Sequence, residues 1–413
     1  FIAGNLNSLF ALCHFQIGIP FQKFILPLGI SYYTLQAVSY VIDVYRGKYE
    51  PDKNIGRVAL FVSFFPQIVE GPIGRYEHLA HQLYVPHKFQ YKNLKFGIQL
   101  MLWGYFKKMV IADRAGLFVN EVFAHYANYT GVTIVLAIIL YTVQIYAEFS
   151  GCMDIVRGTA QMMGIEMTEN FKRPFFSTSV QEFWRRWHIT LGAWLKDYIF
   201  YPISFSKFTA HLTNIAKKIF RNTYLSKLIP AAFALFFVWL GNGIWHGASW
   251  KYIFYGLYYY IVMMIGMLLE PLSNKILDLL KVNTKAFSYR LWQMFRTTII
   301  VFIGMMIFRS HRLLDAWKMF CSIFTFKGIG TLFDGSLFNI GCIPQDFIIL
   351  IIGIALMFVV GILQEKGYHI RERIAKQNLP FRWLLYYGAI FAIIIFGIYG
   401  PGYVASDFIY GQF

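Results

Sequence analysis

Residues 228–250 read LIPAAFALFFVWLGNGIWHGASW, without a single Lys, Arg, Asp or Glu. A helix that crosses a bilayer needs about 20 predominantly apolar residues, because the hydrocarbon core is about 30 Å thick. The stretch therefore predicts a membrane-spanning helix. It also contains a residue that lipid does not favour: His246 lies between Trp245 and Gly247, where an apolar chain would have Leu or Phe.

Composition extends this prediction to the whole chain. The sequence is 57% hydrophobic and only 14% charged, with a mean hydropathy of +0.49. Soluble domains are about 25% charged, so the composition indicates an integral membrane protein. The formal charge of +17 would also suit a nucleic-acid-binding protein. However, the basic residues form short clusters between apolar runs, as in cytoplasmic loops, and we expect no nucleic-acid partner.

Long uncharged windows predict the membrane helices. They cover residues 24–42, 122–147, 228–250, 252–269, 347–364 and 383–406. Shorter apolar stretches at 58–69, 96–106 and 297–308 predict further spans or re-entrant segments. We therefore expect an all-α integral membrane protein with about nine or ten transmembrane helices, forming one membrane domain over residues 1–413. The four cysteines have no spacing typical of a metal site, so no metal is expected.

Lysine and arginine predict an orientation. Segment 204–227 carries five basic residues and no acid, and segment 365–382 carries five against two acids. Cytoplasmic loops are enriched in Lys and Arg, so we expect both segments in the cytoplasm, together with the basic segment 270–296. Residues 319–344 and the C-terminal residues 404–413 are then expected outside.

Two polar side chains near the end of the 228–250 stretch predict a pocket. Asn242 precedes His246 by four residues, so both would lie on one face of a helix. Glycines at 241, 243 and 247 would let a ligand or another helix approach closely. The alternative is a histidine at a helix end that reaches toward the interface beside Lys251.

A second candidate histidine lies in residues 179–198, which read SVQEFWRRWHITLGAWLKDY. The segment is too polar to span and too aromatic for a solvated loop, so we expect one interfacial amphipathic helix. Four side chains would share its apolar face: Trp184, His188, Leu191 and Leu195. Arg185 and Arg186 would point toward lipid headgroups or an anionic ligand. The alternative is a membrane-surface helix whose histidine is merely packed.

Two further stretches combine polar residues with apolar surroundings. In residues 146–154, YAEFSGCMD, we expect Glu148 and Asp154 to be helix-end acids that pair with nearby basic residues. In residues 66–75, PQIVEGPIGR, prolines and glycines interrupt an apolar run, which predicts broken backbone that lines a cavity.

Together these motifs resemble one family. FFPQIVEGPIGRY, WGYFKKMVIADR, YAEFSGCMDI, ENFKRPF, SVQEFWRRWHITLGAWLKDYI and WHGASW follow one another as in the membrane-bound O-acyltransferases. The resemblance is strongest to the bacterial branch that contains the alginate O-acetyltransferase membrane subunit, and it extends from about residue 27 to the C-terminal FIYGQF. It implies a ring of helices around a central channel, with further helices before residue 1.

The resemblance also implies a reaction and a site. His246 matches the active-site histidine, the general base toward an acceptor hydroxyl, and His188 matches the second essential position, which either places the acyl donor or stabilises the intermediate. Substrate contacts are expected from Asn242, Trp245, Trp184 and Arg185. The donor would be a cytoplasmic thioester, acetyl-CoA or an acyl carrier protein, with no bound cofactor. The acceptor would be a cell-surface polysaccharide, reached with an extracytoplasmic acyltransferase partner at the bacterial plasma membrane.

Two other functions fit the sequence. Within the family, the chain could transfer D-alanine from a carrier protein to teichoic acid. Outside it, a polytopic transporter could also place histidines and broken helices at mid-membrane, although no inverted repeat is visible.

Overall fold

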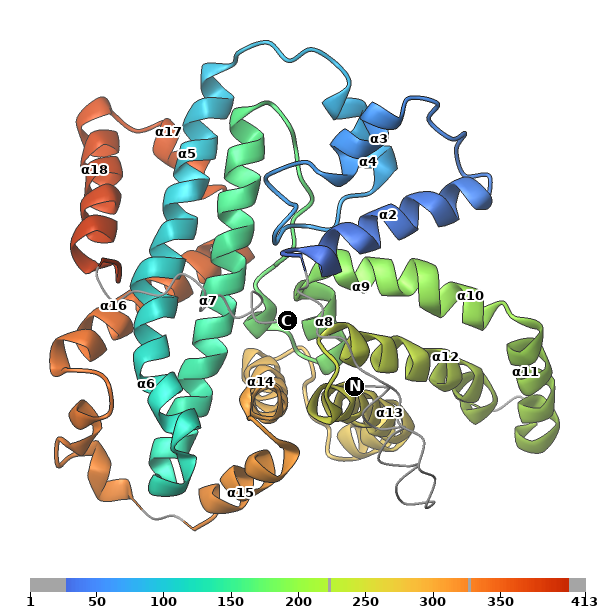
Figure 1. Cartoon of the computed structure of the whole chain (residues 1–413). Coiled ribbons are helices and arrows are strands. Elements are labelled where there is room, and N and C mark those ends of the chain that lie inside the picture. The colour runs from blue at the N-terminus through green and yellow to red at the C-terminus, as the bar shows by residue number, and fades with distance from the viewer. Residues whose placement is uncertain (1–26, 222–223, 326–327, 401–413) are drawn as a thin grey trace, which may run out of the picture.

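The computed structural model describes residues 27–221, 224–325 and 328–400, and the predicted all-α class is confirmed within these ranges (Figure 1). All regular secondary structure there is helical, and a single isolated β-bridge pairs Phe171 with Trp187. The predicted external segment 404–413 lies outside the described residues, as do residues 24–26 of the first predicted window.

Six of the described helices are long and apolar enough to cross a membrane. They are α7 (Val132–Met162), α12 (Tyr224–Trp245), α13 (Trp250–Leu279), α14 (Phe287–Arg309), α16 (Pro344–Glu365) and α18 (Leu379–Phe396). The multi-pass membrane character is therefore confirmed, whereas the count of nine or ten spans stays a prediction. Two predicted windows give only shorter helices, α2 (Ile30–Tyr45) and α3 (Ile55–Val62).

The span predicted over residues 122–147 is confirmed from Val132 onward, but residues 122–131 do not belong to it. Helix α6 (Asp113–Ala124) ends there, a 3-10 turn follows at Tyr126–Asn128, and α7 begins at Val132. Gly131 makes the turn with φ +50° and ψ −112°, a backbone conformation that strongly favours glycine. The polar residues around this turn are uncharged, so the absence of charge in the window did not predict the turn.

Helices α5 (Tyr91–Tyr105), η1 (Phe106–Ala112, a π-helical segment) and α6 form one long rod beside α7 (Figure 1). Glycines allow the two backbones to touch. A Cβ atom on Gly104 would lie 2.5 Å from the carbonyl oxygen of Gly151, and one on Gly97 would lie 2.6 Å from that of Gly158. Small residues at such contacts are the usual way for membrane helices to approach closely.

Buried ion pairs join this rod to its neighbours. Lys107 lies 2.8 Å from Asp154, and Lys108 lies 3.2 Å from Glu148. The expected pairing of the two acids is thus confirmed, but their expected place at a helix end is wrong, because α7 continues to Met162. Ionisable groups at membrane depth are tolerated where they are paired and face the protein interior, as these do.

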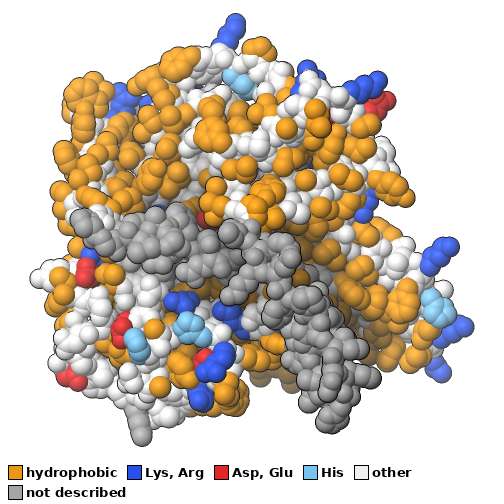
Figure 2. Space-filling model, in the orientation of Figure 1, with side chains coloured by type: hydrophobic (Ala, Val, Ile, Leu, Met, Phe, Trp, Pro, Cys, Tyr) orange, Lys and Arg blue, Asp and Glu red, His pale blue; other side chains and the backbone are white. Residues whose placement is uncertain are grey.

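The remaining helices surround this core. The short helices are α4 (Tyr76–Leu83), α8 (Val180–Arg186), α9 (Ile189–Leu195), η4 (Lys196–Phe200), α10 (Tyr201–Ser204), α11 (Lys207–Phe220), α15 (Leu313–Ile323) and α17 (Ile370–Ala375). Hydrophobic side chains cover much of the face shown in Figure 2, and Lys and Arg side chains lie along its upper and right edges and in its lower central part. Helices α16 and α18 are the least buried of the six spans, as expected for lipid-facing helices.

Candidate active site

His188 and His246 line the same cavity, although they come from different parts of the fold. The cavity has a volume of about 580 Å³. Its walls are mainly apolar and come from α8, α9, α12, α13 and α14: Trp184, Trp187, Leu191, Leu195, Val238, Trp239, Tyr255, Met263, Met305 and Phe308. The histidines are accompanied by few polar groups: Gln181, Arg185, Lys196 and Asn242. A concave apolar site with a few convergent polar groups is typical of a substrate pocket.

His246 follows the last residue of α12 and continues its hydrogen-bond pattern. Its backbone N–H donates to the carbonyl of Asn242 at 3.3 Å, so the predicted shared face is present. Both side chains are buried and both line the cavity. Tyr255 and Phe308 meet the His246 ring edge to face, with centroids 5.7 and 5.0 Å away.

The glycines beside His246 serve helix contact and turning. A Cβ atom on Gly243 would lie 2.4 Å from the carbonyl oxygen of Tyr252, so α12 and α13 touch here. Gly247 has φ +143°, which allows the sharp turn between the two helices. The glycines were expected to let a ligand or another helix approach closely, and at Gly243 it is a helix, α13, that does so.

The prediction of one continuous helix over residues 179–198 is wrong. The chain breaks at His188, which has left-handed backbone dihedrals (φ +48°, ψ +53°), so that α8 and α9 are separate helices. Despite the break, Trp184, His188, Leu191 and Leu195 all line the cavity, as their spacing predicts.

Asn170 holds the broken turn in place. Its backbone carbonyl accepts from the N–H of Ile189 at 3.0 Å, and its side-chain Oδ1 accepts from the N–H and hydroxyl of Thr190, each at 3.0 Å. Contacts between residues far apart in the sequence thus stabilise a backbone conformation that L-residues otherwise avoid. This explains why helical spacing alone did not predict the break.

The same oxygen determines which ring nitrogen of His188 carries the proton. A backbone N–H can only donate, so the Asn170 atom facing Thr190 is an acceptor oxygen. Nδ1 of His188 lies 3.3 Å from this oxygen and is therefore the donor. In the neutral ring Nε2 then keeps its lone pair. Nε2 is buried and has no hydrogen-bond partner among the described residues. His188 is thus able to accept one further hydrogen bond, through Nε2.

Asn170 belongs to the motif ENFKRPF, but the sequence alone predicts no role for it. The spacing offered no signal, because Asn170 and His188 are 18 residues apart and belong to different local structures.

The other predicted substrate contacts divide into two kinds. Trp184 and Arg185 line the cavity, Arg185 as an exposed side chain at its edge. Trp245 lies beside both histidines instead, with ring centroids 5.5 Å from His188 and 4.9 Å from His246. Arg186 is not directed at an anionic ligand as predicted: it pairs with Glu182 at 2.6 Å and with Glu365 at 3.0 Å.

The segment 66–75 is irregular backbone, as predicted, but it does not line the histidine cavity. The N–H of Ile73 donates to the Thr190 hydroxyl at 3.0 Å, and Arg75 pairs with Asp197 at 2.7 Å. The segment thus buttresses the turn that carries His188.

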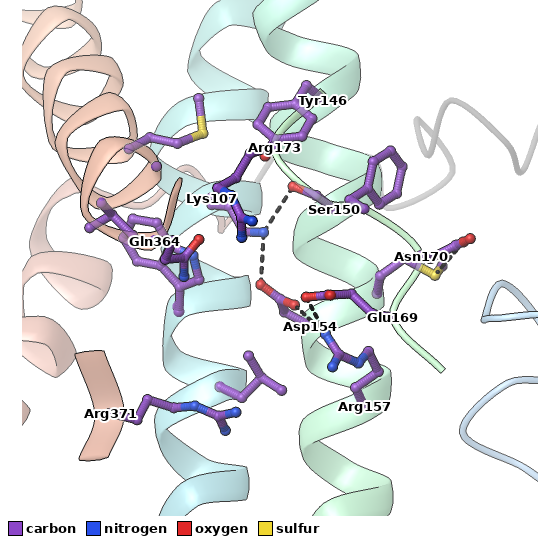
Figure 3. Close-up of a pocket in the computed structure, with 17 residues that line it drawn as sticks. Lys107, Tyr146, Ser150, Asp154, Arg157, Glu169, Asn170, Arg173, Gln364 and Arg371 are labelled. Atoms are coloured by element: carbon purple, nitrogen blue, oxygen red, sulfur yellow. Dashed lines mark hydrogen bonds and ion pairs between the residues drawn. The ribbon is translucent and has the colours of Figure 1, made fainter. Parts of the chain in front are cut away.

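A second, smaller cavity of about 150 Å³ lies between α5, α7 and α16 (Figure 3). Its lining is polar and includes Asn170, so one residue contacts both His188 and this second cavity. Within the described ranges no three His, Cys, Asp or Glu side chains lie close enough to hold a metal ion.

Comparisons with known proteins agree with the motifs. The family profile of the membrane-bound O-acyltransferases (MBOAT) matches residues 52–213, a range that includes His188 and ends before His246. The chain is 34% identical over 302 residues to the probable alginate O-acetylase AlgI of Pseudomonas syringae pv. tomato, covering 73% of this chain and 52% of that protein.

Two further relatives have other activities. The peptidoglycan O-acetyltransferase of Helicobacter pylori is 31% identical over 267 residues (58% of this chain, 47% of the relative). The teichoic acid D-alanyltransferase of Bacillus subtilis is 30% identical over 272 residues (64% of this chain, 65% of the relative). The chain spans about half the length of the alginate and peptidoglycan relatives it matches. On these matches and on its shared motifs, the chain belongs to the membrane-bound O-acyltransferase family.

Proposed function

We propose that this protein transfers an acyl group, acetyl in the first instance, from a cytoplasmic thioester to a hydroxyl outside the membrane. The acceptor is a cell-surface polysaccharide or an extracytoplasmic partner that completes the transfer. One observation carries the proposal: two buried histidines from separate elements line a single apolar cavity. The activities of the relatives, acetylation of alginate or peptidoglycan and D-alanylation of teichoic acid, support the class of reaction.

In the proposed reaction the acceptor oxygen attacks the thioester carbonyl while Nε2 or Nδ1 of His246 takes the hydroxyl proton. The tetrahedral intermediate then collapses, the C–S bond breaks, and the imidazolium returns the proton to the departing thiolate. A neutral imidazole suits both steps near pH 7. Exclusion of water by the aromatic walls protects the thioester from hydrolysis and strengthens electrostatic contacts inside.

His188 acts on the other side of the reacting carbon in this proposal. Its Nε2 lone pair accepts a hydrogen bond from an amide N–H of the donor arm and so positions the donor. Asn242, Trp184 and Arg185 shape the pocket and its entrance. The donor is acetyl-CoA or an acyl carrier protein, and the whole protein forms a ring of about nine or ten helices in the bacterial plasma membrane.

D-alanyl transfer from a carrier protein is the second candidate, because the Bacillus subtilis relative is covered over 65% of its length. The two functions differ in the donor. Purified protein in proteoliposomes, given radiolabelled acetyl-CoA or D-alanyl carrier protein, should label itself, a partner or an added polymer with only one of them.

His246→Ala provides the decisive variant. It should remain monodisperse and lose transfer by about 10²–10⁴-fold, the usual contribution of a general base. His211→Ala is the matched control, because His211 is an exposed histidine on α11. Wild-type rates in His246→Ala membranes would rule out the assigned base. Transport of the labelled small molecule across the membrane unchanged, without transfer, would instead favour a transporter.

A further inference from the structure

The small polar cavity beside Asn170 has more cations than its carboxylates neutralise (Figure 3). Four basic side chains line it, namely Lys107, Arg157, Arg173 and Arg371, against Asp154 and Glu169. Its volume of about 150 Å³ far exceeds the roughly 10–15 Å³ that one water requires. The cavity is thus large enough for a polyatomic group and has an excess of positive charge.

Two of the four cations are already neutralised. The ammonium of Lys107 donates to Ser150 and to Asp154, each at 2.8 Å. Arg173 pairs with Glu365 at 2.7 Å, outside the cavity lining. These contacts use Asp154 and leave Glu169 as the remaining lining carboxylate.

Arg157 is incompletely hydrogen-bonded. Its Nη1 lies 3.7 Å from both Asp154 and Glu169, which is longer than a hydrogen bond. Its Nε is buried and has no hydrogen-bond partner within the described ranges. Half of the Glu169 side chain is exposed, which weakens its attraction for Arg157 by solvent screening.

Arg371 approaches the cavity from α17 without a carboxylate of its own. Its Nη1 donates to two neutral oxygens, the carbonyl of Phe96 and Oε1 of Gln161, each at 3.0 Å. In the part of the chain that the structure describes, no acid forms an ion pair with it. Burial, followed by the charge of Arg157, lowers the pKa of Arg371, and the charges of Asp154, Glu372 and Glu169 offset only part of this, so the two guanidinium groups repel each other. In Figure 3 their side chains extend toward each other from different helices.

We propose that this cavity binds a phosphate group between Arg157 and Arg371. Planar guanidinium groups form paired, charge-assisted hydrogen bonds with phosphate oxygens, and an anion there relieves the repulsion between the two arginines. The phosphate belongs to an acidic phospholipid of the cytoplasmic leaflet or to a soluble phosphate ester. Both sources reach this end of the protein, since α17 lies in segment 365–382, which the positive-inside rule places in the cytoplasm.

The position between helices suits a lipid headgroup. Met357, Val360 and Gly361 of α16 form one wall, while the neighbouring Phe358 and Val359 are exposed toward the surroundings. Basic pockets between membrane helices on the cytoplasmic side bind anionic headgroups in this manner.

The test measures binding rather than acyl transfer, so its outcome does not depend on whether the proposed function is correct. Protein in nanodiscs of phosphatidylcholine with phosphatidylglycerol is released into a native mass spectrometer, and retained phosphatidylglycerol is counted. In a second arm, inorganic phosphate is titrated into protein in phosphatidylcholine alone, and the thermal midpoint is followed. In Arg157→Gln and in Arg371→Gln, the apparent affinity for the bound species should fall about tenfold. The fall should be seen as less retained phosphatidylglycerol in the first arm or as weaker thermal stabilisation by phosphate in the second.

Arg373→Gln is the matched control, because Arg373 is exposed on the same helix and stacks on Tyr368. It should bind as the wild type does. Arg157→Lys and Arg371→Lys keep the charge and guard against misfolding; they should bind with intermediate affinity because they lose the paired donors. Retention of phosphatidylglycerol alone identifies a lipid site, and stabilisation by inorganic phosphate identifies a soluble ester. If the Gln variants match Arg373→Gln in both arms, the cavity is an ion-pair cluster and the proposal is wrong.

Discussion

Oδ1 of Asn170 accepts a hydrogen bond from Nδ1 of His188 at 3.3 Å, and this contact fixes the tautomer of the histidine. The oxygen is identified by the N–H of Thr190, which can only donate. The contact therefore leaves the lone pair of the neutral ring on Nε2, which is buried and has no hydrogen-bond partner among the described residues. Asn170 contacts no reacting atom in the proposed reaction and acts through His188 as a positioning residue.

Asn170→Ala should reduce acyl transfer by about 10²-fold, the cost of a small misplacement of a catalytic group. His188→Ala should be at least as inactive. Because Asn170 acts through His188, adding Asn170→Ala to His188→Ala should cause no further loss of rate. Asn170→Asp keeps the acceptor oxygen and places a negative charge beside Nδ1, so it should restore part of the activity and shift the pH–rate profile to higher pH. Additive losses in the double variant, with an unshifted profile in Asn170→Asp, would indicate a purely structural role.

Gly243→Ala should destabilise the protein and impair the site. The new methyl group would lie 2.4 Å from the backbone carbonyl oxygen of Tyr252, which cannot rotate away. Overpacking of this kind costs about 1–3 kcal/mol. The thermal midpoint in detergent measures the effect. Gly266→Ala on α13 is the control, since nothing lies within 4 Å of its added carbon, and it should be neutral or slightly stabilising. Equal midpoints for the two variants would contradict the close contact between α12 and α13.

Asp346→Ala should strongly destabilise the protein, because it removes one partner of a buried ion pair. Arg114 is buried and pairs with Asp346, and its other terminal nitrogen donates to the carbonyl of Phe396. Removal of one partner leaves a buried charge uncompensated, which costs about 3–5 kcal/mol. Glu77→Gln is the comparison, because its ion pair with Lys48 is largely exposed and should contribute no more than about 1 kcal/mol. Denaturation in detergent that ranks the two variants equally would show that the Arg114 pair is solvated.

Charge reversal on α11 should weaken binding of the acyl donor and leave the rate of the chemical step unchanged. Lys217 and Lys218 are exposed and belong to the basic segment 204–227 that is expected in the cytoplasm. Coenzyme A and a carrier protein are both anionic, so Lys217→Glu with Lys218→Glu should raise the donor KM and leave kcat unchanged. Added salt should weaken the donor dependence of the wild type, because exposed charges are screened within about 8–10 Å. Unchanged donor kinetics together with altered lipid dependence would make α11 a membrane anchor.

The predicted features that hold are those which neighbouring residues determine. The apolar runs predicted α12, α13, α16 and α18 because transfer into lipid depends on the summed polarity of consecutive residues. Asn242 and His246 share a face because their spacing equals one helical turn. The turn at Gly131 was missed because it interrupts an apolar run without a charge, and its signal is a backbone conformation rather than a composition.

The sequence by itself therefore determined the membrane class, the family and both candidate histidines. Only the tertiary structure decided that His188 interrupts a helix, which of its nitrogens contacts Asn170, and that His188 and His246 line one cavity. The physical reason is that these features depend on contacts between distant segments. Asn170 reaches His188, Ile73 reaches Thr190, and α8 packs near α12 and α13. Periodicity describes one element at a time, whereas a strained turn persists only where other elements supply the hydrogen bonds that hold it.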